Sequence, residues 1–267
     1  MENQPETSAT MNSTNCQLLR TDFGHEVYDT WYLEHAKHNF EAPDFVRKYF
    51  SFYEKVLQLT KNDRILDAGC GIGSYTREFA RRGYQVVGMD KSPNFLSEAQ
   101  KITQSEELEI EYVLGNYNEM AYEQPFSVIF FEGSFFYASK AGLVSLLQQI
   151  HNKLTPDGRL YFVHSNPHIR KQQFPMVDLS EIQKNILVLE MAEYDKHKGG
   201  ERCIWVRIDL ETQIHYRCDY FNMHLPPDEL KDCIVTAGFT DFDFYKKREI
   251  GKFNPQNDSG FSVVCRK

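Results

Sequence analysis

Residues 64–76 contain the feature that most limits how this chain can fold: a buried strand, a glycine turn and the start of a helix. Glycines alternate after the strand at Gly69, Gly71 and Gly73. Glycine has no Cβ and adopts positive φ without strain, so such a turn lets the backbone approach a bound molecule closely. The helix that follows offers free N–H groups at its N-terminus. This run predicts a βαβ unit with a ligand at its turn.

A second strand follows and ends in a carboxylate about fourteen residues past this run. It reads Val86-Val87-Gly88-Met89-Asp90. A carboxylate at this place in a βαβ unit holds a ribose. The two strands therefore indicate a cofactor that contains a nucleoside.

The glycine spacing discriminates between nucleoside cofactors. Dinucleotide binding uses G-x-G-x-x-G, whereas counting from Gly69 or Gly71 places Ser74 or Thr76 at the third glycine position. An acidic residue, Asp67, also ends the first strand. This run resembles the first motif of the class I S-adenosylmethionine (SAM) dependent methyltransferases, in which an acidic residue precedes G-x-G-x-G. An NAD-dependent oxidoreductase stays as the alternative.

The resemblance continues in the expected order through residues 45 to 165. Residues 112–117 are similar to the third segment of the family, 126–133 to its fourth strand and 159–164 to its fifth strand. Leucine and isoleucine spacing between 143 and 154 predicts the intervening helix, and residues 156–158 predict a turn.

The resemblance implies SAM as the cofactor and assigns roles to several residues. Asp67 would reach the amino group of the methionine part, Asp90 both ribose hydroxyls, and Asn116 the adenine amino group. The other predicted cofactor contacts lie in the glycine turn, after the strands and in the N-terminal segment; they are Tyr28, Tyr32, Gly69, Cys70, Gly71, Gly73, Lys91, Ser92, Tyr117, Phe131 and Glu132.

The predicted fold is α/β: a Rossmann-like, doubly wound, seven-stranded sheet, mostly parallel with an antiparallel last strand. We expect a disordered tail at 1–20 and a single domain at 21–267. Aromatic spacing predicts a helical N-terminal cap within 23–59. An antiparallel β insertion is expected within 166–224 as a lid over the strand ends, with strands at 186–194, 203–210 and 213–222. The final two strands are expected at 240–245 and 261–266.

The composition of the chain argues against several classes of binding partner. The net charge of −8 disfavours nucleic acid, which is bound chiefly through clustered Lys and Arg. Six scattered cysteines predict neither a disulfide framework nor a metal site. With no apolar span and a polar N-terminus, the chain is expected to be cytoplasmic and away from membranes.

The expected reaction is in-line methyl transfer to a small-molecule acceptor. The fourth segment reads Phe131-Glu132-Gly133-Ser134 and lacks the N-P-P-Y-like tetrad of nucleic-acid amino methyltransferases. His164 is the candidate proton acceptor and Tyr137 the candidate group that orients the acceptor; the alternatives are a histidine bonded to backbone and a packing tyrosine. A non-catalytic SAM-binding or interaction module also stays open. A pocket of Tyr28, Trp31, Tyr137 and Tyr216 would attract a cationic amine.

Overall fold

The computed structural model describes residues 17–21, 32–34, 36–37, 43–119, 122, 124–133 and 135–267. The predicted cofactor contact Tyr28 and the neighbouring Trp31 lie outside these residues.

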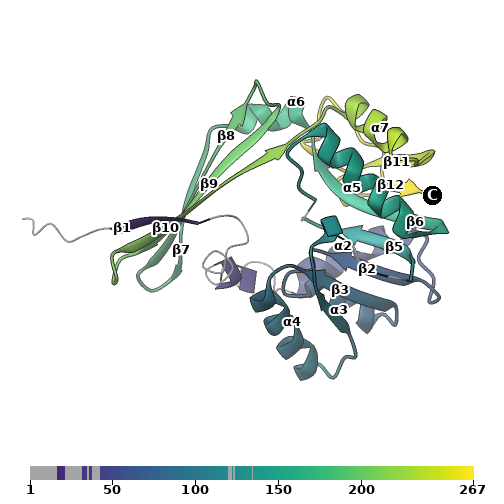
Figure 1. The fold of residues 1–267 in the computed structure, drawn as a ribbon, viewed down its shortest axis with the longest axis horizontal. Helices are drawn as coiled ribbons and strands as arrows, with labels where there is room; N and C mark the ends of the chain where they lie inside the picture. Colours follow the sequence, from purple (N-terminus) through teal and green to yellow (C-terminus); the bar gives the residue numbers. More distant parts are fainter. Residues whose placement is uncertain are drawn as a thin grey trace, which may run out of the picture.

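Seven strands form the large sheet in the order β11-β12-β6-β5-β2-β3-β4 (Figure 1). The strands from β2 to β6 pair in parallel, whereas β12 pairs antiparallel with both β6 and β11, as predicted. Chain order reverses at β2, and open α/β sheets bind ligands at such a point, outside the carboxyl ends of the strands. The bounds are β2 (Arg64–Ala68), β3 (Gln85–Asp90), β4 (Glu111–Leu114), β5 (Phe126–Phe131), β6 (Leu154–Ser165), β11 (Asp241–Lys246) and β12 (Gly260–Arg266).

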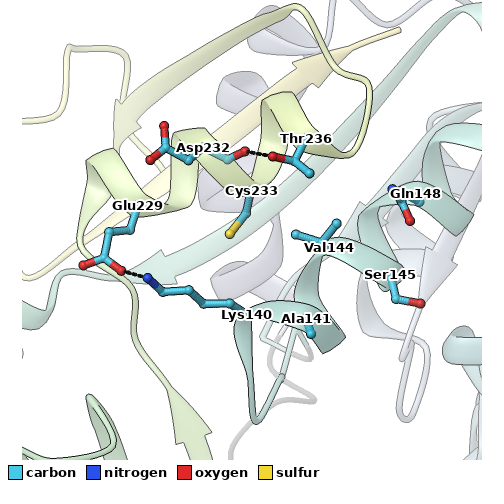
Figure 2. Close-up of a pocket in the computed structure, with 9 residues that line it drawn as sticks. All are labelled: Lys140, Ala141, Val144, Ser145, Gln148, Glu229, Asp232, Cys233 and Thr236. Atoms are coloured by element: carbon cyan, nitrogen blue, oxygen red, sulfur yellow. Dashed lines mark hydrogen bonds and ion pairs between the residues drawn. The ribbon is translucent and has the colours of Figure 1, made fainter.

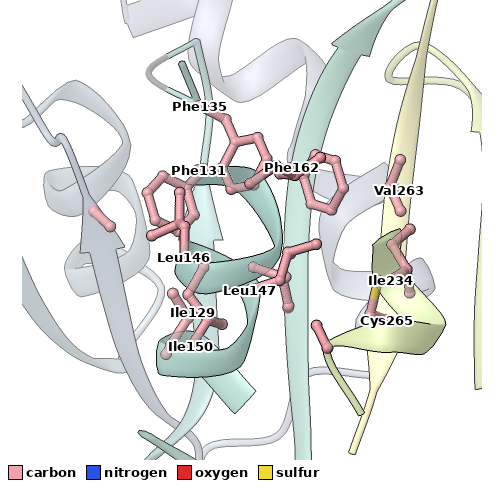
Figure 3. Packing of buried hydrophobic residues seen from close by; sticks show 14 of the residues in the cluster. Ile129, Phe131, Phe135, Leu146, Leu147, Ile150, Phe162, Ile234, Val263 and Cys265 are labelled. Carbon is pink, nitrogen blue, oxygen red and sulfur yellow. The ribbon is translucent and has the colours of Figure 1, made fainter. Parts of the chain in front are cut away.

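Helices cover both faces of the large sheet because its strands are apolar on both sides. Alternate residues of β5 point to opposite faces. Ile129 and Phe131 pack with α5 (Lys140–Lys153) and α7 (Pro227–Thr236), in the cluster of Figure 3. Val128 and Phe130 pack with α2 (Pro43–Val56) and α3 (Ser74–Arg81). The remaining helix of this layer, α4 (Pro93–Ser105), contacts β3 and β4.

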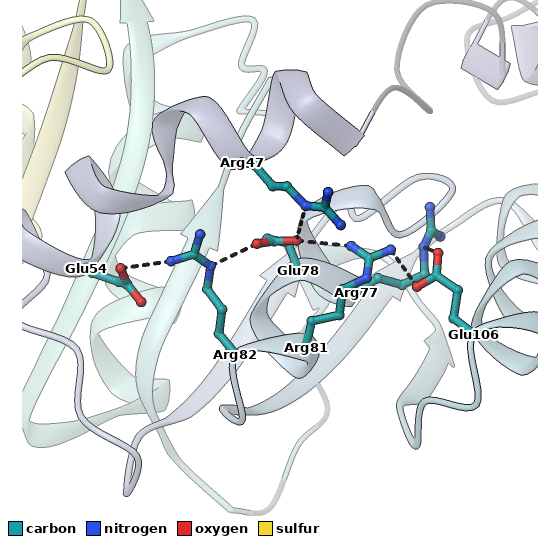
Figure 4. A network of polar contacts seen from close by, with 7 residues as sticks. All are labelled: Arg47, Glu54, Arg77, Glu78, Arg81, Arg82 and Glu106. Atoms are coloured by element: carbon teal, nitrogen blue, oxygen red, sulfur yellow. Dashed lines mark hydrogen bonds and ion pairs between the residues drawn. The ribbon is translucent and has the colours of Figure 1, made fainter.

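A network of charged side chains joins α2 to α3 (Figure 4). Glu78 is buried and accepts hydrogen bonds from Arg81 and Arg82 at 3.1 and 2.8 Å. Arg82 also donates to Glu54 of α2 at 3.0 Å. Each carboxylate is therefore paired, which a buried charge requires.

Five strands form the small sheet, in the order β1-β10-β9-β8-β7, which projects to the left of the large sheet in Figure 1. Three of its strands match the expected insertion: β8 (Ile186–Asp195), β9 (Gly200–Asp209) and β10 (Ile214–Met223). Two others were not predicted: β7 (Met176–Gln183) and β1 (Gln17–Thr21), which pairs in parallel with β10.

Local sequence explains these differences. The turn between β7 and β8 uses Asn185 at φ 67°, without the glycine that usually marks a hairpin. The strand β1 overlaps the expected tail at 1–20, so that boundary was wrong. Residues 156–158, where a turn was expected, lie inside β6. The pairing of β6 with β5 is interrupted there, between Leu154 and Arg159.

Candidate active site

The glycine turn after β2 has the backbone that the sequence predicted. Gly69, Gly71 and Gly73 have φ of 73°, 54° and 77°. The amides of Gly69 and Cys70 donate to the Met89 carbonyl at 2.8 and 2.9 Å, which fixes the turn against β3. A Cβ added at Gly71 would meet nothing nearer than 4.0 Å. Gly71 thus leaves open space at the strand ends, as a bound cofactor needs.

Gly73 is subject to a steric constraint that the sequence did not indicate. A Cβ at this position would overlap the hydroxyl of Tyr112 and lie 3.1 Å from its Cζ. A Cβ on Gly88 of β3 would also lie 2.7 Å from the Tyr112 ring. The glycine therefore makes room for Tyr112, whose hydroxyl lies 3.0 Å from Thr103 Oγ1.

Asp90 ends β3 and faces the glycine turn. Its Oδ2 accepts from the Gly71 amide and its Oδ1 from the Ser92 amide, each at 2.9 Å. Each carboxylate oxygen has a second lone pair, so these bonds leave capacity for ribose hydroxyls. Ser92 is buried and caps α4 by accepting from the Phe95 amide at 3.2 Å.

Asp67 is a buried carboxyl at the end of β2. Its Oδ2 accepts from the Thr76 hydroxyl at 2.6 Å. Burial raises the pKa of Asp67 to about 7. The hydrogen bond from Thr76 lowers this pKa, whereas the charges of Asp90 and Glu132 raise it further. A cation placed here would relieve this cost. The carboxyl thus suits the ammonium of the methionine part.

Four other predicted contacts lie around the turn. Lys91 is exposed beside Asp90, and Cys70 is half-buried in the turn. Asn116 is exposed after β4, and its carbonyl accepts from the Glu119 amide at 2.8 Å. Tyr117 is half-buried; burial raises its pKa, and so does the charge of Asp90. These positions surround the carboxyl ends of β3 and β4.

The side chain of Phe131 belongs to the core rather than to a ligand surface. It is completely buried, and its ring centroid lies 5.1 Å from those of Tyr117 and Phe135. The predicted cofactor contact through this side chain is therefore not supported.

Glu132 lies at the end of β5 and is already fully engaged. Its Oε2 accepts from the hydroxyls of Tyr53 and Tyr161, each at 3.0 Å. Its Oε1 accepts from Nε of Arg248 at 2.8 Å and also from Nη2. The arginine amide donates in turn to Ser262 Oγ at 3.0 Å. A carboxylate has about four acceptor sites, so none is left for the predicted cofactor bond.

His164 and Tyr137 lie together, with parallel rings 5.9 Å apart. The imidazole is buried, and its Nε2 lies 3.1 Å from the Leu225 carbonyl, to which it donates. Burial lowers the pKa of His164 to about 3, and the nearby His224 adds to this effect. These contacts favour a structural role over the predicted role of proton acceptor. Tyr137 is also buried in the core, and burial raises its pKa.

Tyr32 connects the cofactor side of the site to the small sheet. Its ring lies 5.8 Å from Phe95 of α4 and 5.1 Å from Trp205 of β9. Burial raises the pKa of Tyr32 to about 12, and the charges of Glu190 and Asp90 act in the same direction. The face of the small sheet that bears Glu190, Glu201 and Trp205, here called the inner face, therefore lies close to Asp90.

A surface groove of about 440 Å³ lies between α5 and α7 (Figure 2). Lys140 of α5 and Glu229 of α7 form an ion pair across it. No residue that lines this groove is among the predicted site residues. Among the described residues, no three potential ligands gather as a metal site, and no helix is long and apolar enough to cross a membrane.

Known proteins resemble this chain in sequence. Residues 65–158 match the family described as a methyltransferase domain. A protein of Geobacillus sp. (strain WCH70) that bears a methyltransferase name is 28% identical over 190 residues, covering 66% of this chain and 74% of that protein. The 23S rRNA (uracil(1939)-C(5))-methyltransferase RlmD of Enterobacter sp. (strain 638) is 26% identical, but the match covers 52% of this chain and 34% of that enzyme.

Solved structures share the fold. An S-adenosylmethionine-dependent methyltransferase from Clostridium acetobutylicum has a TM-score of 0.71 at 12% identity, covering 90% of this chain and 98% of that one. The CcbJ methyltransferase of Streptomyces caelestis has a TM-score of 0.69 at 18% identity, with coverage of 88% and 95%. CalS10, an amino pentose methyltransferase from Micromonospora echinaspora, has a TM-score of 0.59 at 15% identity, with coverage of 90% and 97%.

A doubly wound sheet with a glycine turn and two carboxylates at its switch point defines an enzyme with a nucleoside cofactor. Residues 65–158 match a methyltransferase domain, and the chain shares the fold of solved S-adenosylmethionine-dependent methyltransferases, which use SAM. The open space at Gly71 and the buried carboxyl of Asp67 fit that cofactor. When bound, SAM supplies an electrophilic methyl group on a sulfonium, and the protein must orient the acceptor and exclude water.

Proposed function

We propose that this enzyme methylates the amine of a small-molecule acceptor, held between the strand ends of the large sheet and the inner face of the small sheet. The observation that carries the proposal is the position of the Tyr32 ring, 5.8 Å from Phe95 of α4 and 5.1 Å from Trp205 of the inner face. Because the ring contacts both residues, the inner face lies above the predicted cofactor site.

The chemistry of the inner face favours an amine. Register places Glu190 opposite Trp205, and Cys203, of the same face, opposite Tyr220. Burial raises the pKa of Glu190. A hydrogen bond from Trp205 lowers this pKa, whereas the charges of Asp178 and Glu201 raise it further. A desolvated carboxylate beside aromatic rings attracts a cationic group. It also stabilises the positive charge that develops on nitrogen as the methyl group arrives.

The structural neighbours agree with this acceptor class. CalS10 is an amino pentose methyltransferase by name. RlmD acts on ribosomal RNA by name, but the net charge of −8 weighs against a phosphate-binding surface on this chain. A small amine is therefore the better candidate than RNA.

The first requirement of this reaction is that the protein positions the two reactants. The neutral amine nitrogen attacks the methyl carbon, the carbon–sulfur bond breaks, and S-adenosylhomocysteine leaves with the electron pair on sulfur. Holding the two reactants in line supplies about 7–11 kcal/mol in well-oriented cases.

The test is a screen for S-adenosylhomocysteine formation by the full chain with SAM and matched acceptors. Each amino sugar or simple amine is paired with the analogue that carries a hydroxyl in place of nitrogen, and transfer RNA and ribosomal RNA form a separate arm. We expect turnover with members of the amine set only. Turnover with RNA alone, or equal turnover with the hydroxyl analogues, contradicts the proposal.

A further inference from the structure

His224 is a buried histidine that the sequence did not single out. It follows β10, and its amide donates to the Gly199 carbonyl at 2.9 Å. The preceding amide, of Met223, donates to the Tyr137 carbonyl at 2.9 Å. Its ring meets that of His164 edge-on, with 6.1 Å between centroids. These contacts place the imidazole beside the carboxyl ends of β5 and β6, next to the predicted acceptor space.

One nitrogen of this imidazole is held by a carboxylate. Nε2 of His224 lies 3.5 Å from Glu201 Oε1 and 3.3 Å from the side-chain amide of Asn222. The Asn222 Oδ1 is buried with no partner among the described residues, and turning this amide over lets Oδ1 accept from Nε2–H as well. The other oxygen of Glu201 accepts from Nε and Nη2 of Arg170, at 3.3 and 3.1 Å. Burial alone would raise the pKa of Glu201, but the hydrogen bond with His224 and the charges of His224 and Arg170 lower it below its ordinary value. This lowered pKa favours the ionised form of Glu201, which can accept a hydrogen bond from Nε2–H of His224.

The other nitrogen, Nδ1, is buried and has no hydrogen-bond partner among the described residues. Leaving a buried polar atom unpaired costs about 1–3 kcal/mol. With the proton on Nε2, Nδ1 presents a lone pair. An acceptor N–H would supply the partner that this atom lacks.

We propose that His224 is the catalytic base of the methyl transfer, and that Glu201 and Arg170 are positioning residues that fix its tautomer. The inference rests on the proposed function. As the acceptor nitrogen bonds to the methyl carbon, the carbon–sulfur pair goes to sulfur and the nitrogen gives its proton to Nδ1. The imidazolium then forms a charge pair with Glu201, and its proton returns to water after the products leave.

The environments of the two neighbouring histidines differ in the way this assignment needs. His164 donates Nε2–H to a carbonyl and faces no carboxylate among its recorded partners. His224 has an ionised carboxylate on one nitrogen and an empty bonding position on the other. The titratable and charged groups that lie around His224 are Glu201 of β9, Arg170 of α6 (Pro167–Arg170), His164 of β6 and Tyr137.

The first test needs no acceptor. Nitrogen-15 NMR of the full chain labelled at histidine, with S-adenosylhomocysteine bound, reports the tautomer of each ring, and His224→Gln assigns the signal. We expect Nε2–H with unprotonated Nδ1 at pH 8, and loss of this tautomer preference in Glu201→Gln. A proton on Nδ1 overturns the proposal, whatever the acceptor is.

The second test uses an amine that is turned over in the screen above. We expect His224→Gln to lower kcat by about 10²–10⁴-fold, with an unchanged KM for SAM and without the acidic limb of the pH–rate profile. Glu201→Gln should move that limb to lower pH. His197→Gln, at an exposed histidine in the β8–β9 turn, is the control and should behave as wild type.

The two tests separate the possible failures. A His224→Gln enzyme that binds SAM normally and keeps kcat within threefold of wild type overturns the assignment while leaving the proposed function intact. A wild-type chain that turns over no amine in the screen refutes the proposed function instead, and the tautomer measurement still decides whether Nδ1 can accept a proton.

Discussion

Arg248 and Glu132 form a buried ion pair that joins the β11–β12 connection to the end of β5. The Glu132 side chain is 2% exposed and that of Arg248 is 18% exposed. Arg248 holds this position with φ of 56°, a left-handed backbone that costs a non-glycine residue about 1–2 kcal/mol. The guanidinium also lies over the rings of Phe45 and Tyr49 of α2. One side chain thus fixes α2, β5 and the C-terminal hairpin together.

Breaking this pair should destabilise the fold. We expect Arg248→Met to lower the free energy of unfolding by about 3–5 kcal/mol, because it leaves the Glu132 carboxylate buried without its cation. Urea denaturation measures the change. Arg266→Met is the control, since Arg266 pairs with the more exposed Asp241 and Asp243 and should cost about 1 kcal/mol or less. Equal losses in the two variants would show that the buried pair contributes no more than a surface one.

A glycine can be needed because its φ is positive or because a neighbour leaves no room for a Cβ. Gly73 and Gly199 allow these two reasons to be separated. Both have positive φ, but only Gly73 would place a Cβ against Tyr112, while Gly199 has nothing within 4 Å. Gly199→Ala should lose about 1 kcal/mol through its backbone alone, and Gly73→Ala about 3 kcal/mol, because overpacking adds to that strain. Calorimetric unfolding of both variants tests this difference. If they lose the same stability, Tyr112 does not constrain the turn.

SAM affinity should depend on the ionisation of Asp67. Its pKa is about 7 in the free protein, and the ionised form is the one that pairs with the methionine ammonium. Binding below pH 7 must therefore release a proton, so the dissociation constant should rise about tenfold per pH unit as the pH falls from 7 to 5. Calorimetric titration across this range measures it. In Asp67→Asn the dependence should disappear; an unchanged slope in that variant would remove Asp67 from cofactor binding.

Asp90 is expected to hold the ribose through two charge-assisted hydrogen bonds. Asp90→Ala should weaken SAM binding by at least tenfold, because each such bond contributes about 1.5–3 kcal/mol. Circular dichroism must first show that the variant is folded, since Asp90 also accepts from the Gly71 and Ser92 amides. Folded Asp90→Ala protein with wild-type affinity would refute the ribose assignment.

The sequence predicted the large sheet well because its information is local. The apolar strands, the glycine turn and the carboxylates of Asp67 and Asp90 all lie within short segments. The strand β7 was missed because its turn uses Asn185 with left-handed backbone instead of glycine. At Gly73 the sequence could not show the steric constraint from Tyr112, because Tyr112 is distant in the sequence.

Contacts between distant residues account for the site residues that the sequence could not identify. Glu132 looked available for the cofactor because its partners Tyr53 and Arg248 are 79 and 116 residues away. His164 looked like a base because the Leu225 carbonyl to which it donates lies in the β10–α7 connection, 61 residues away. His224 has no sequence motif of its own, and only the folded chain brings Glu201 to it.

Calorimetric titration of the full chain with SAM, S-adenosylhomocysteine and NAD tests the central claim most directly. The account predicts one site per chain for SAM and S-adenosylhomocysteine, both weakened in Asp90→Ala, and no heat of binding with NAD. Binding of NAD without SAM would contradict it, because the turn at Gly69, Gly71 and Gly73 would then hold a dinucleotide.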